Sequence, residues 1–408
     1  MFPLSQLERS RPYAADQGAC AFYTSIEEVK EMIKSAYLHI PFCEHICHYC
    51  DFNKVFLKGQ PVDDYINALD LEMKMTLDQF PTNDLNTIFV GGGTPTSLNE
   101  QQLYQFCESI NRNLPKHKSV EFTFEANPGD LTMGKLKILK EAGVNRISLG
   151  VQTFNEELLK KIGRVHKPKD VYQTIDNAKS LGFENISIDL IFSLPSQTLT
   201  DFKETLREAF SLDITHYSAY SLIIEPKTVF YNLMKKGKLP TPGEDAEAAM
   251  YELLMEEMER HGFNQYEISN FSKPGFESRH NLTYWNNDPY YGFGAGAHSY
   301  LNGIRRSNIG PLKRYMDQIN SGILPVMEEH PTTKVEQMEE EMFLGLRKTA
   351  GVSISHFIEK FAVDPLQLFE KELVELTAKL WLEVGNNHIF LTKKGRLLGN
   401  EVFQAFLR

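Results

Sequence analysis

The feature that most constrains the fold is an alternation of strand-like and helix-like segments between residues 36 and 223. Short runs of β-branched and aromatic residues are separated by segments in which apolar residues recur three or four positions apart. A strand that is followed each time by a helix implies a parallel sheet with right-handed crossover connections. The expected strands span residues 36–40, 87–92, 120–126, 146–152, 186–192 and 216–223.

These strand and helix units are too few for a closed eight-unit barrel, which takes about 250 residues. A flat doubly wound sheet is the main alternative, but no GxGxxG fingerprint follows the first expected strand. We therefore expect an α/β fold built on an open, partial (β/α)6 barrel.

The barrel is expected at residues 32–230, and three other regions flank it. Residues 1–31 match none of the periodicity and form an N-terminal extension without an assigned function. Residues 231–320 form a linking region. Residues 321–408 are expected to fold as a smaller, mainly helical domain with a short hairpin, similar to a winged-helix module. DNA binding by such a module is less favoured than a covering or docking role, because the formal net charge is -11.

The composition indicates a soluble protein of the cytoplasm. The N-terminus lacks the apolar core of a signal peptide, and no segment has the long uncharged apolar run of a membrane helix. The negative charge argues against an extended nucleic-acid-binding face. In a reducing cytosol, clustered cysteines are more often metal ligands or catalytic thiols than disulfides. Cys20 and Cys107 lie apart from the cluster and are interpreted as ordinary thiols, Cys107 on a helix.

Three of the five cysteines, Cys43, Cys47 and Cys50, follow the first expected strand with the spacing CxxxCxxC. Loops after the strands build the active face of a parallel barrel, so chemistry is expected there. A structural zinc site needs four ligands, and His45 or His48 would have to complete the set. An iron–sulfur cluster held by three thiolates instead leaves one iron open to a small molecule.

The CxxxCxxC loop on a partial barrel resembles the radical S-adenosylmethionine superfamily. In that superfamily, the open iron of a 4Fe-4S cluster chelates the amino acid end of S-adenosylmethionine. The resemblance implies reductive cleavage of this cofactor to an adenosyl radical. It also implies that the glycines of GGGTPT, at the end of the second expected strand, bind the methionine amino group.

Polar residues also lie at or near the carboxyl ends of the later strands, namely Glu125, Gln152, Asp189 and, after the fourth strand, Arg164. One such residue is more often a cap. Four on a shared face suit a cofactor that carries ribose hydroxyls, a carboxylate and an ammonium group. The natural pairings are Arg164 with the carboxylate, and Glu125 or Asp189 with the ribose.

Within the superfamily, the sequence resembles the oxygen-independent coproporphyrinogen III oxidase family across residues 36–408, through GGGTPT, EANP and GVQTF. The resemblance implies that Tyr37 and Tyr49 flank the cluster. The contacts to S-adenosylmethionine that it implies are those of Gly92, Gly93, Thr94, Glu125, Gln152, Arg164 and Asp189.

One departure from the oxidases separates two branches of this family. The oxidases carry a fourth cysteine, in the pattern CxxxCxxCxC, where this sequence has Phe52. The sequence is therefore similar to the haem chaperone branch, and HNLTYW at residues 280–285 fits the HNxxYW motif of that branch. His280 is the candidate haem ligand, since a neutral imidazole is a standard axial ligand. His298 is a second candidate of lower standing.

We therefore predict a haem chaperone that binds a 4Fe-4S cluster and S-adenosylmethionine and passes haem to acceptor haemoproteins. The alternative is an enzyme that converts coproporphyrinogen III to protoporphyrinogen IX, an activity against which Phe52 argues. A zinc-bearing winged-helix regulator is less favoured than either. The sequence leaves open the acceptor, the cleavage of S-adenosylmethionine in the working cycle, a homodimer and peripheral membrane contact.

Overall fold

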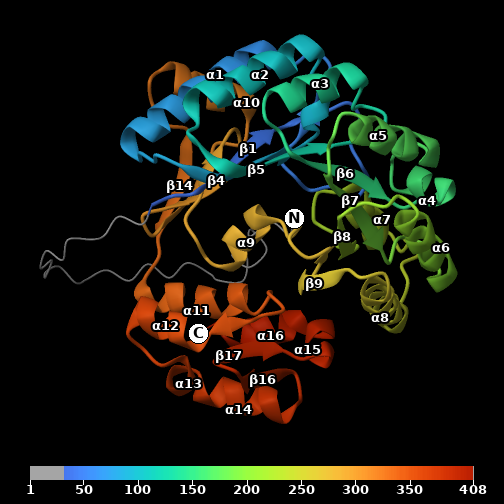
Figure 1. Ribbon diagram of the computed structural model, residues 1–408, viewed down its shortest axis with the longest axis vertical. Coiled ribbons are helices and arrows are strands. Elements are labelled where there is room, and N and C mark those ends of the chain that lie inside the picture. The colour runs from blue at the N-terminus through green and yellow to red at the C-terminus, as the bar shows by residue number, and fades with distance from the viewer. Residues whose placement is uncertain (1–31, 408) are drawn as a thin grey trace, which may run out of the picture. The chain divides into compact units, whose positions relative to one another are not determined.

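The structure is a computed structural model that describes residues 32–407. The predictions for residues 1–31 and for Cys20 lie outside these described residues. Figure 1 shows a curved sheet covered on its outer side by helices, followed in the chain by a smaller, mainly helical region.

All six predicted strands are present, and each pairs in parallel with the next. They are β1 (Ser35–Ile40), β4 (Leu85–Gly92), β5 (Lys116–Ala126), β6 (Arg146–Gln152), β7 (Asn185–Phe192) and β8 (His216–Ser221). The full sheet has nine strands in the order β11-β1-β4-β5-β6-β7-β8-β10-β9. Its outermost strands, β11 and β9, do not pair with each other in the described chain, so the predicted open barrel is confirmed.

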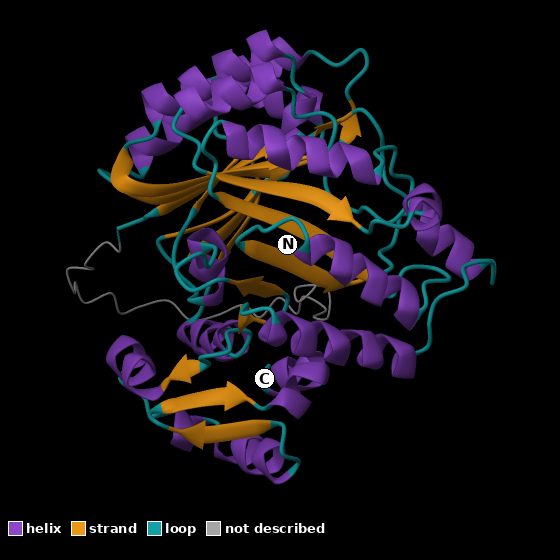
Figure 2. Ribbon diagram, turned by 45° about the vertical axis from the view of Figure 1, so that its right-hand side comes forward, coloured by secondary structure: helices purple, strands orange, loops and turns teal. Residues whose placement is uncertain are grey.

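Amphipathic helices cover the outer face of this sheet (Figure 2). Several begin at a residue whose side chain accepts a backbone N–H bond of the first turn, such as Asn99, Thr132 and Thr198. Cys107 is buried on one of these helices, as predicted. The covering helices are α1 (Val62–Gln79), α2 (Glu100–Asn113), α3 (Met133–Glu141), α4 (Glu156–Lys161), α5 (Pro168–Ser180), α6 (Leu199–Phe210) and α8 (Glu244–Arg260).

The two faces of the sheet differ in polarity because side chains alternate along each strand. Apolar residues such as Leu38, Val90 and Ile188 belong to the main hydrophobic core with the helices. Many of the alternate positions, which point to the inner face, are polar, among them His39, Ser187 and Asp189. There, Ser187 and His216 pair through Oγ and Nδ1 at 2.7 Å. The cores of closed barrels are dominated by Val, Ile and Leu, so a polar interior indicates a lumen that receives a polar ligand.

The segment between the barrel strands and the C-terminal region adds strands to both edges of the main sheet. β11 (Tyr291–Phe293) pairs in parallel with β1, whereas β10 (Asn270–Ser272) lies antiparallel to β8 and to β9 (Asn264–Glu267). The remaining elements are α7 (Val229–Lys235), α9 (Arg279–Trp285), α10 (Leu312–Asn320) and a small sheet of β12 (His298–Leu301), β13 (Ile304–Asn308) and β14 (Val326–Pro331). The boundaries at residues 230 and 320 stay predictions.

The C-terminal region is mainly helical and contains the expected hairpin, formed by β16 (Leu382–Gly385) and β17 (His388–Leu391). A short third strand, β15 (Val352–Ser353), pairs with β17. The helices are α11 (Lys334–Gly345), α12 (Ile354–Phe361), α13 (Pro365–Leu368), α14 (Glu370–Ala378), α15 (Lys393–Leu397) and α16 (Gly399–Ala405). Among residues 32–407, none of the helices combines the length and the apolar character that a membrane span requires.

Candidate functional site

The cysteine loop leaves the carboxyl end of β1 and is closed by a short parallel ladder. β2 (Phe42–Cys43) pairs with β3 (Val55–Phe56), and the Leu57 amide donates to the Cys43 carbonyl at 2.9 Å. The middle of the loop is tied down at His48, whose amide donates to the Ile162 carbonyl at 3.0 Å. The loop therefore has a defined place against the helical layer, as a cofactor-binding loop requires.

The three thiols of this loop are free, and two of them, Cys43 and Cys50, lie in surroundings that disfavour their ionised form. Burial raises the pKa of Cys43, and it raises the pKa of Cys50 to about 12. Nearby positive charge is therefore needed before these cysteines act as thiolate ligands. Lys54 opposes the rise in pKa at both Cys43 and Cys50, and Arg164 opposes it at Cys43. Arg164 Nη1 also lies 3.6 Å from the Cys47 Sγ atom.

Within residues 32–407, no three His, Cys, Asp or Glu side chains converge closely enough to hold a single metal ion. The predicted alternative of a zinc site completed by His45 or His48 is therefore not formed. A 4Fe-4S cluster spreads its thiolates over separate irons. Spaced cysteine sulfurs therefore suit a cluster better than they suit one ion.

A strip of glycines at the end of β4 lies against the cysteine loop and the next strand. A Cβ atom on Gly93 would lie 3.0 Å from the Cys43 sulfur, and one on Gly91 would lie 2.6 Å from a Glu125 carboxylate oxygen. Gly92 has a φ of 114°, a backbone conformation that side-chain-bearing residues rarely adopt. Its amide donates to Glu125 Oε2 at 3.1 Å. Bare backbone is thus exposed beside the cysteines.

Hydrogen bonds connect the predicted residues Thr94 and Arg164 to two of the cysteines. Thr94 Oγ1 donates to Cys43 Sγ at 3.6 Å, and Arg164 Nη1 contacts Cys47 Sγ. Asn127 lies between them: it donates to Thr94 Oγ1 at 3.1 Å and accepts from Arg164 Nη2 at 2.8 Å. Asn127 was not predicted, although it stands in the EANP stretch directly after the third strand.

Glu125 on β5 and Asp189 on β7 lie on either side of β6, close enough for the charge of Asp189 to act on Glu125. Burial and, second, the charge of Asp189 together raise the pKa of Glu125 to about 7. Burial also raises the pKa of Asp189, which accepts a hydrogen bond from Ser148 Oγ at 3.2 Å. Two carboxyl groups in one lumen form a polar face that suits ribose hydroxyls.

Gln152 ends β6 in a strained backbone conformation. Its φ is 68°, in the left-handed region, and its side chain is buried. The register of β6 against β7 shifts between Gly150 and Gln152. A Cβ atom on Gly150 would lie 3.0 Å from the Gln152 amide nitrogen and 2.9 Å from Arg164 Nη2. The side chains of Gln152 and Arg164 therefore both lie against Gly150, near the carboxyl end of β6.

The two tyrosines that were expected beside the cluster occupy different surroundings. Tyr49 lies in the cysteine loop, where it packs on the apolar group around Ile162, and burial raises its pKa. Tyr37 lies inside the sheet on β1, with its hydroxyl 3.0 Å from His39 Nδ1 and its ring stacked on Phe89. Tyr49 is thus next to Cys47 and Cys50, whereas Tyr37 faces the lumen.

The predicted haem ligand, His280, is fully buried on α9, which lies on the inner side of the curved sheet (Figure 1). Its Nδ1 pairs with Thr87 Oγ1 at 2.8 Å and its Nε2 with the Tyr284 hydroxyl at 2.9 Å. Its ring also stacks on Phe89 at 5.1 Å. Burial lowers the pKa of His280 to about 3. The ring is thus neutral, and both of its nitrogens are engaged.

His280 does not lie at the edge of the sheet that carries the cysteines. Its partner Thr87 is near the amino end of β4, about 16 Å along the strand from Gly92 at the rise of an extended chain. Tyr37 and Phe89 stand between the two levels. The cysteine loop and the HNxxYW helix therefore occupy opposite ends of one lumen.

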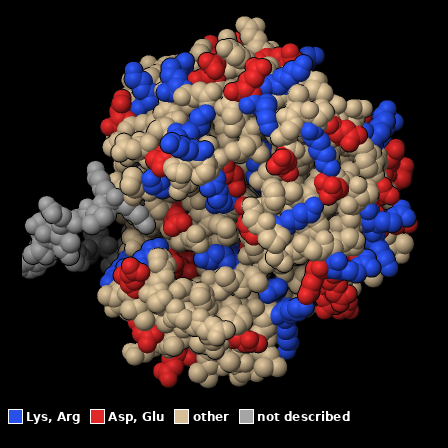
Figure 3. Space-filling model, viewed as in Figure 1, with Lys and Arg blue, Asp and Glu red and all other residues tan. Residues whose placement is uncertain are grey.

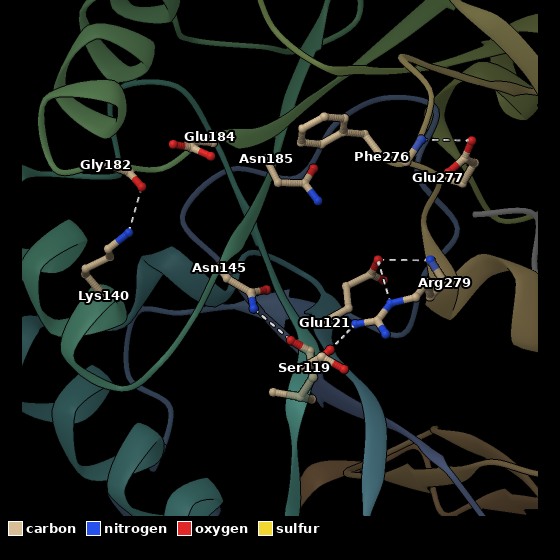
Figure 4. Close-up of a pocket in the computed structure, with 12 residues that line it drawn as sticks. Ser119, Glu121, Lys140, Asn145, Gly182, Glu184, Asn185, Phe276, Glu277 and Arg279 are labelled. Atoms are coloured by element: carbon tan, nitrogen blue, oxygen red, sulfur yellow. Dashed lines mark hydrogen bonds and ion pairs between the residues drawn. The ribbon is translucent and has the colours of Figure 1, made fainter.

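The amino terminus of α9 is held by Glu121, a buried residue of β5. Glu121 accepts the backbone amides of Arg279 at 2.9 Å and His280 at 3.0 Å. Figure 4 shows the contact between Glu121 and Arg279 at the side of a cavity of about 550 Å³, which is lined in part by residues near the amino ends of β5, β6 and β7 and by residues of the loop before α9. Lys140 at this cavity is already bonded to the Gly182 carbonyl at 2.7 Å. The residues that line the cavity do not include any of the three cysteines of the loop.

The charges on the surface do not form a single-sign field on the face shown in Figure 3. There, Lys and Arg side chains are interspersed with Asp and Glu side chains. Nucleic-acid-binding faces carry clustered Lys and Arg. This face has the mixed pattern of an ordinary surface.

Comparison with known proteins first defines the class. Residues 37–209 match the Radical SAM superfamily, and residues 332–398 match the HemN C-terminal domain. The solved structure of coproporphyrinogen III oxidase (HemN) from Escherichia coli has a TM-score of 0.81 at 23% identity, covering 92% of this chain and 90% of that chain. The protein is therefore a radical S-adenosylmethionine protein with the fold of that oxidase.

Closer relatives then give the family. Heme chaperone HemW of Bacillus subtilis (strain 168) is 58% identical over 376 residues, which cover 92% of this chain and 99% of the relative. Heme chaperone HemW of Lactococcus lactis subsp. lactis (strain IL1403) is 48% identical over 91% of this chain and 97% of the relative. The chain belongs to the HemW family, and the resemblance inferred from the cysteine loop and the HNxxYW motif is confirmed.

Membership of the radical S-adenosylmethionine superfamily implies a 4Fe-4S cluster and S-adenosylmethionine. The carboxyl edge of the sheet suits both. It combines three free thiols, a glycine strip without room for side chains, a guanidinium group and two carboxyl groups. These are the thiolate, backbone, cationic and acceptor groups that a cluster and an aminocarboxylate nucleoside need.

Proposed function

We propose that this protein is a haem chaperone that binds haem and passes it to acceptor haemoproteins in the cytoplasm. The observation that carries the proposal is the identity of 58% to Heme chaperone HemW of Bacillus subtilis over 99% of that protein. Free clustered thiols also suit a reducing compartment.

In this proposal, Cys43, Cys47 and Cys50 hold a 4Fe-4S cluster with Tyr37 and Tyr49 on either side of it. When bound, the cluster supplies an electron and an open iron site for S-adenosylmethionine. The residues proposed to contact S-adenosylmethionine are Gly92, Gly93, Thr94, Glu125, Gln152, Arg164 and Asp189.

Arg164 has the capacity for this role. A guanidinium group has five N–H donors. Three of those bonds go to Cys47, Asn127 and Gly150. Two donors therefore remain for the carboxylate of S-adenosylmethionine.

His280 is proposed as an axial ligand of haem iron. The neutral imidazole that its lowered pKa maintains is the form that binds iron. Binding through Nε2 requires that His280 exchange the Tyr284 hydroxyl for iron. Haem uptake in this proposal therefore breaks the hydrogen bond between His280 and Tyr284.

The first experiment uses the full chain, reconstituted anaerobically with iron, sulfide and S-adenosylmethionine, with haem or coproporphyrinogen III added to separate samples. A stable Soret band without conversion of coproporphyrinogen III supports the chaperone. Conversion to protoporphyrinogen IX without stable haem binding would instead support the oxidase alternative that Phe52 argues against.

Matched variants separate a ligand role of His280 from a packing role. His280→Phe removes the imidazole but keeps an aromatic ring next to Phe89. Tyr284→Phe and Thr87→Val each remove one hydrogen bond of the imidazole and leave the ring in place. A ligand role predicts loss of the Soret band in His280→Phe only. Equal losses in all three variants would mean that His280 supports the fold and does not bind iron.

A homodimer and peripheral contact with a membrane are compatible with this proposal. Sedimentation of the reconstituted protein and flotation with liposomes test them.

A further inference from the structure

Asn127 connects two of the cysteines through a continuous chain of hydrogen bonds. On one side it donates to Thr94 Oγ1 at 3.1 Å, and Thr94 Oγ1 donates to Cys43 Sγ at 3.6 Å. On the other side it accepts from Arg164 Nη2 at 2.8 Å, and Arg164 Nη1 donates to Cys47 Sγ at 3.6 Å. One amide therefore stands midway between two thiols that are four positions apart in the sequence.

The orientation of this amide is set by its partners. Asn127 Nδ2 has two acceptors, Thr94 Oγ1 and Asp130 Oδ2, the second at 3.2 Å. Its Oδ1 faces the Arg164 guanidinium group, which only donates. A flipped amide would set two donors against each other on the Arg164 side. An amide of this length is thus required, since Asp would lose the donor and Leu would lose both groups.

Arg164 depends on this contact for its place beside the cysteine loop. Its Nη2 is shared between Asn127 Oδ1 and the Gly150 carbonyl, which leaves Nη1 directed at Cys47. Without Asn127, a long flexible side chain would have only one neutral anchor. The position of a positive charge 3.6 Å from a cysteine sulfur therefore rests on Asn127.

Hydrogen bonds to cluster sulfurs and nearby charge are two of the factors that set the reduction potential of an iron–sulfur cluster. Donors and cations stabilise the reduced state, which carries one more negative charge. We infer that Asn127 is a positioning residue that holds Thr94 against Cys43 and Arg164 against Cys47, and thereby raises the reduction potential of the bound cluster. The inference rests on the cluster of the proposed function, but not on haem transfer.

The test is a redox titration of the anaerobically reconstituted full chain, with dithionite as the one-electron donor and the reduced cluster followed by electron paramagnetic resonance. Asn127→Leu removes both hydrogen bonds at similar volume. We expect about a tenfold lower ratio of reduced to oxidised cluster at a fixed potential, which is about 59 mV for one electron. Asn127→Asp keeps the oxygen that accepts from Arg164 but loses the donor to Thr94 and adds a negative charge near the cluster, so its shift is in the same direction.

Asn145→Asp is the matched control. Like Asn127, Asn145 is an asparagine next to a strand of the same sheet: Asn127 directly follows β5 and Asn145 directly precedes β6. Its Nδ2 donates to the Val120 carbonyl at 2.7 Å. It lies at the amino edge, beside the cavity in Figure 4. The same change of charge there should move the ratio less than threefold. A shift as large as that of Asn127→Asp would overturn the inference, because it would reflect overall charge.

Two further outcomes decide the inference. If both Asn127 variants bind the full content of iron and their clusters have the reduction potential of the wild type, the inference is overturned. A folded Asn127→Leu protein with less iron than the wild type would support positioning of the thiolates, whereas a protein unfolded at 25 °C would overturn a role beyond the fold. If the wild type itself binds no cluster, the proposed function fails instead, so the two failures are distinguishable.

Discussion

Replacing Gly93 by alanine tests whether the glycine strip needs to be bare backbone. The added Cβ would lie 2.7 Å from the Phe42 carbonyl oxygen, 2.9 Å from the Pro41 carbonyl carbon and 3.0 Å from Cys43 Sγ. Two of these atoms belong to the backbone of the loop that β3 holds in place. The clash therefore cannot be relieved by a side-chain rotation alone.

The expected cost follows from this geometry. Overpacking a rigid site costs about 1–3 kcal/mol. The φ of Gly93 is not in the left-handed region, so alanine gains about 0.4–1 kcal/mol by restricting the unfolded chain. The net loss in the free energy of unfolding is about 1–2 kcal/mol, and the relief of the clash displaces Cys43 from its position in the loop.

The assay has two parts. Urea unfolding of the iron-free protein measures the cost to the fold, and the iron content after anaerobic reconstitution measures the effect on the cluster. Gly385→Ala is the control, because its Cβ would meet nothing within 4 Å and its φ is not positive. A Gly93→Ala protein with wild-type stability and full iron content would refute the role assigned to the glycine strip.

Three other predictions concern protonation, S-adenosylmethionine and iron. Burial lowers the pKa of His280 to about 3, so the stability due to its neutral ring is present above pH 6.5 and lost as the pH falls toward 3. When the pH is lowered from 7.5 to 5, the free energy of unfolding measured in urea should therefore fall by about 2 kcal/mol more for the wild type than for His280→Phe. A difference between the two proteins that stays constant with pH would contradict this. The substitution Arg164→Lys removes the guanidinium group that contacts Asn127 and Cys47 at the same time. The variant should bind S-adenosylmethionine about tenfold more weakly in equilibrium dialysis. An unchanged affinity would argue against Arg164 as a ligand. Removal of iron by a chelator should weaken S-adenosylmethionine binding in the same dialysis, and equal binding would exclude an iron-bound mode.

Much of the fold could be predicted because the spacing of apolar residues along the chain indicates where strands and helices form. The strand at Arg146–Gln152 coincides with the predicted range, and the others differ by a few residues at their ends. Alternation of strand and helix leads to one parallel arrangement, and the carboxyl ends of parallel strands meet at one edge. This is why Thr94 and Arg164, 70 positions apart, could both be expected beside the cysteine loop.

Other features depend on contacts that no local pattern contains. The burial of His280 results from α9 packing on β4, whose Thr87 is 193 positions away. The strands β9, β10 and β11, which extend the sheet beyond the six barrel strands, are too short for a periodic signal. A sequence motif can indicate that a histidine is a candidate iron ligand, but the accessibility of that histidine depends on the elements that surround it.

The sequence by itself determined the class of sheet, the spacing of the three thiols and the absence of a fourth at Phe52, because each is a property of neighbouring residues. Only the tertiary structure decided that Asn127 joins two of those thiols and that His280 lies at the opposite end of the lumen, closed by Tyr284 and Thr87. Hydrogen bonds between distant segments form only after the strands have paired, since pairing sets which side chains share a face. The presence and spacing of the thiols could therefore be read from neighbouring residues, whereas the contacts that surround them depend on the tertiary structure.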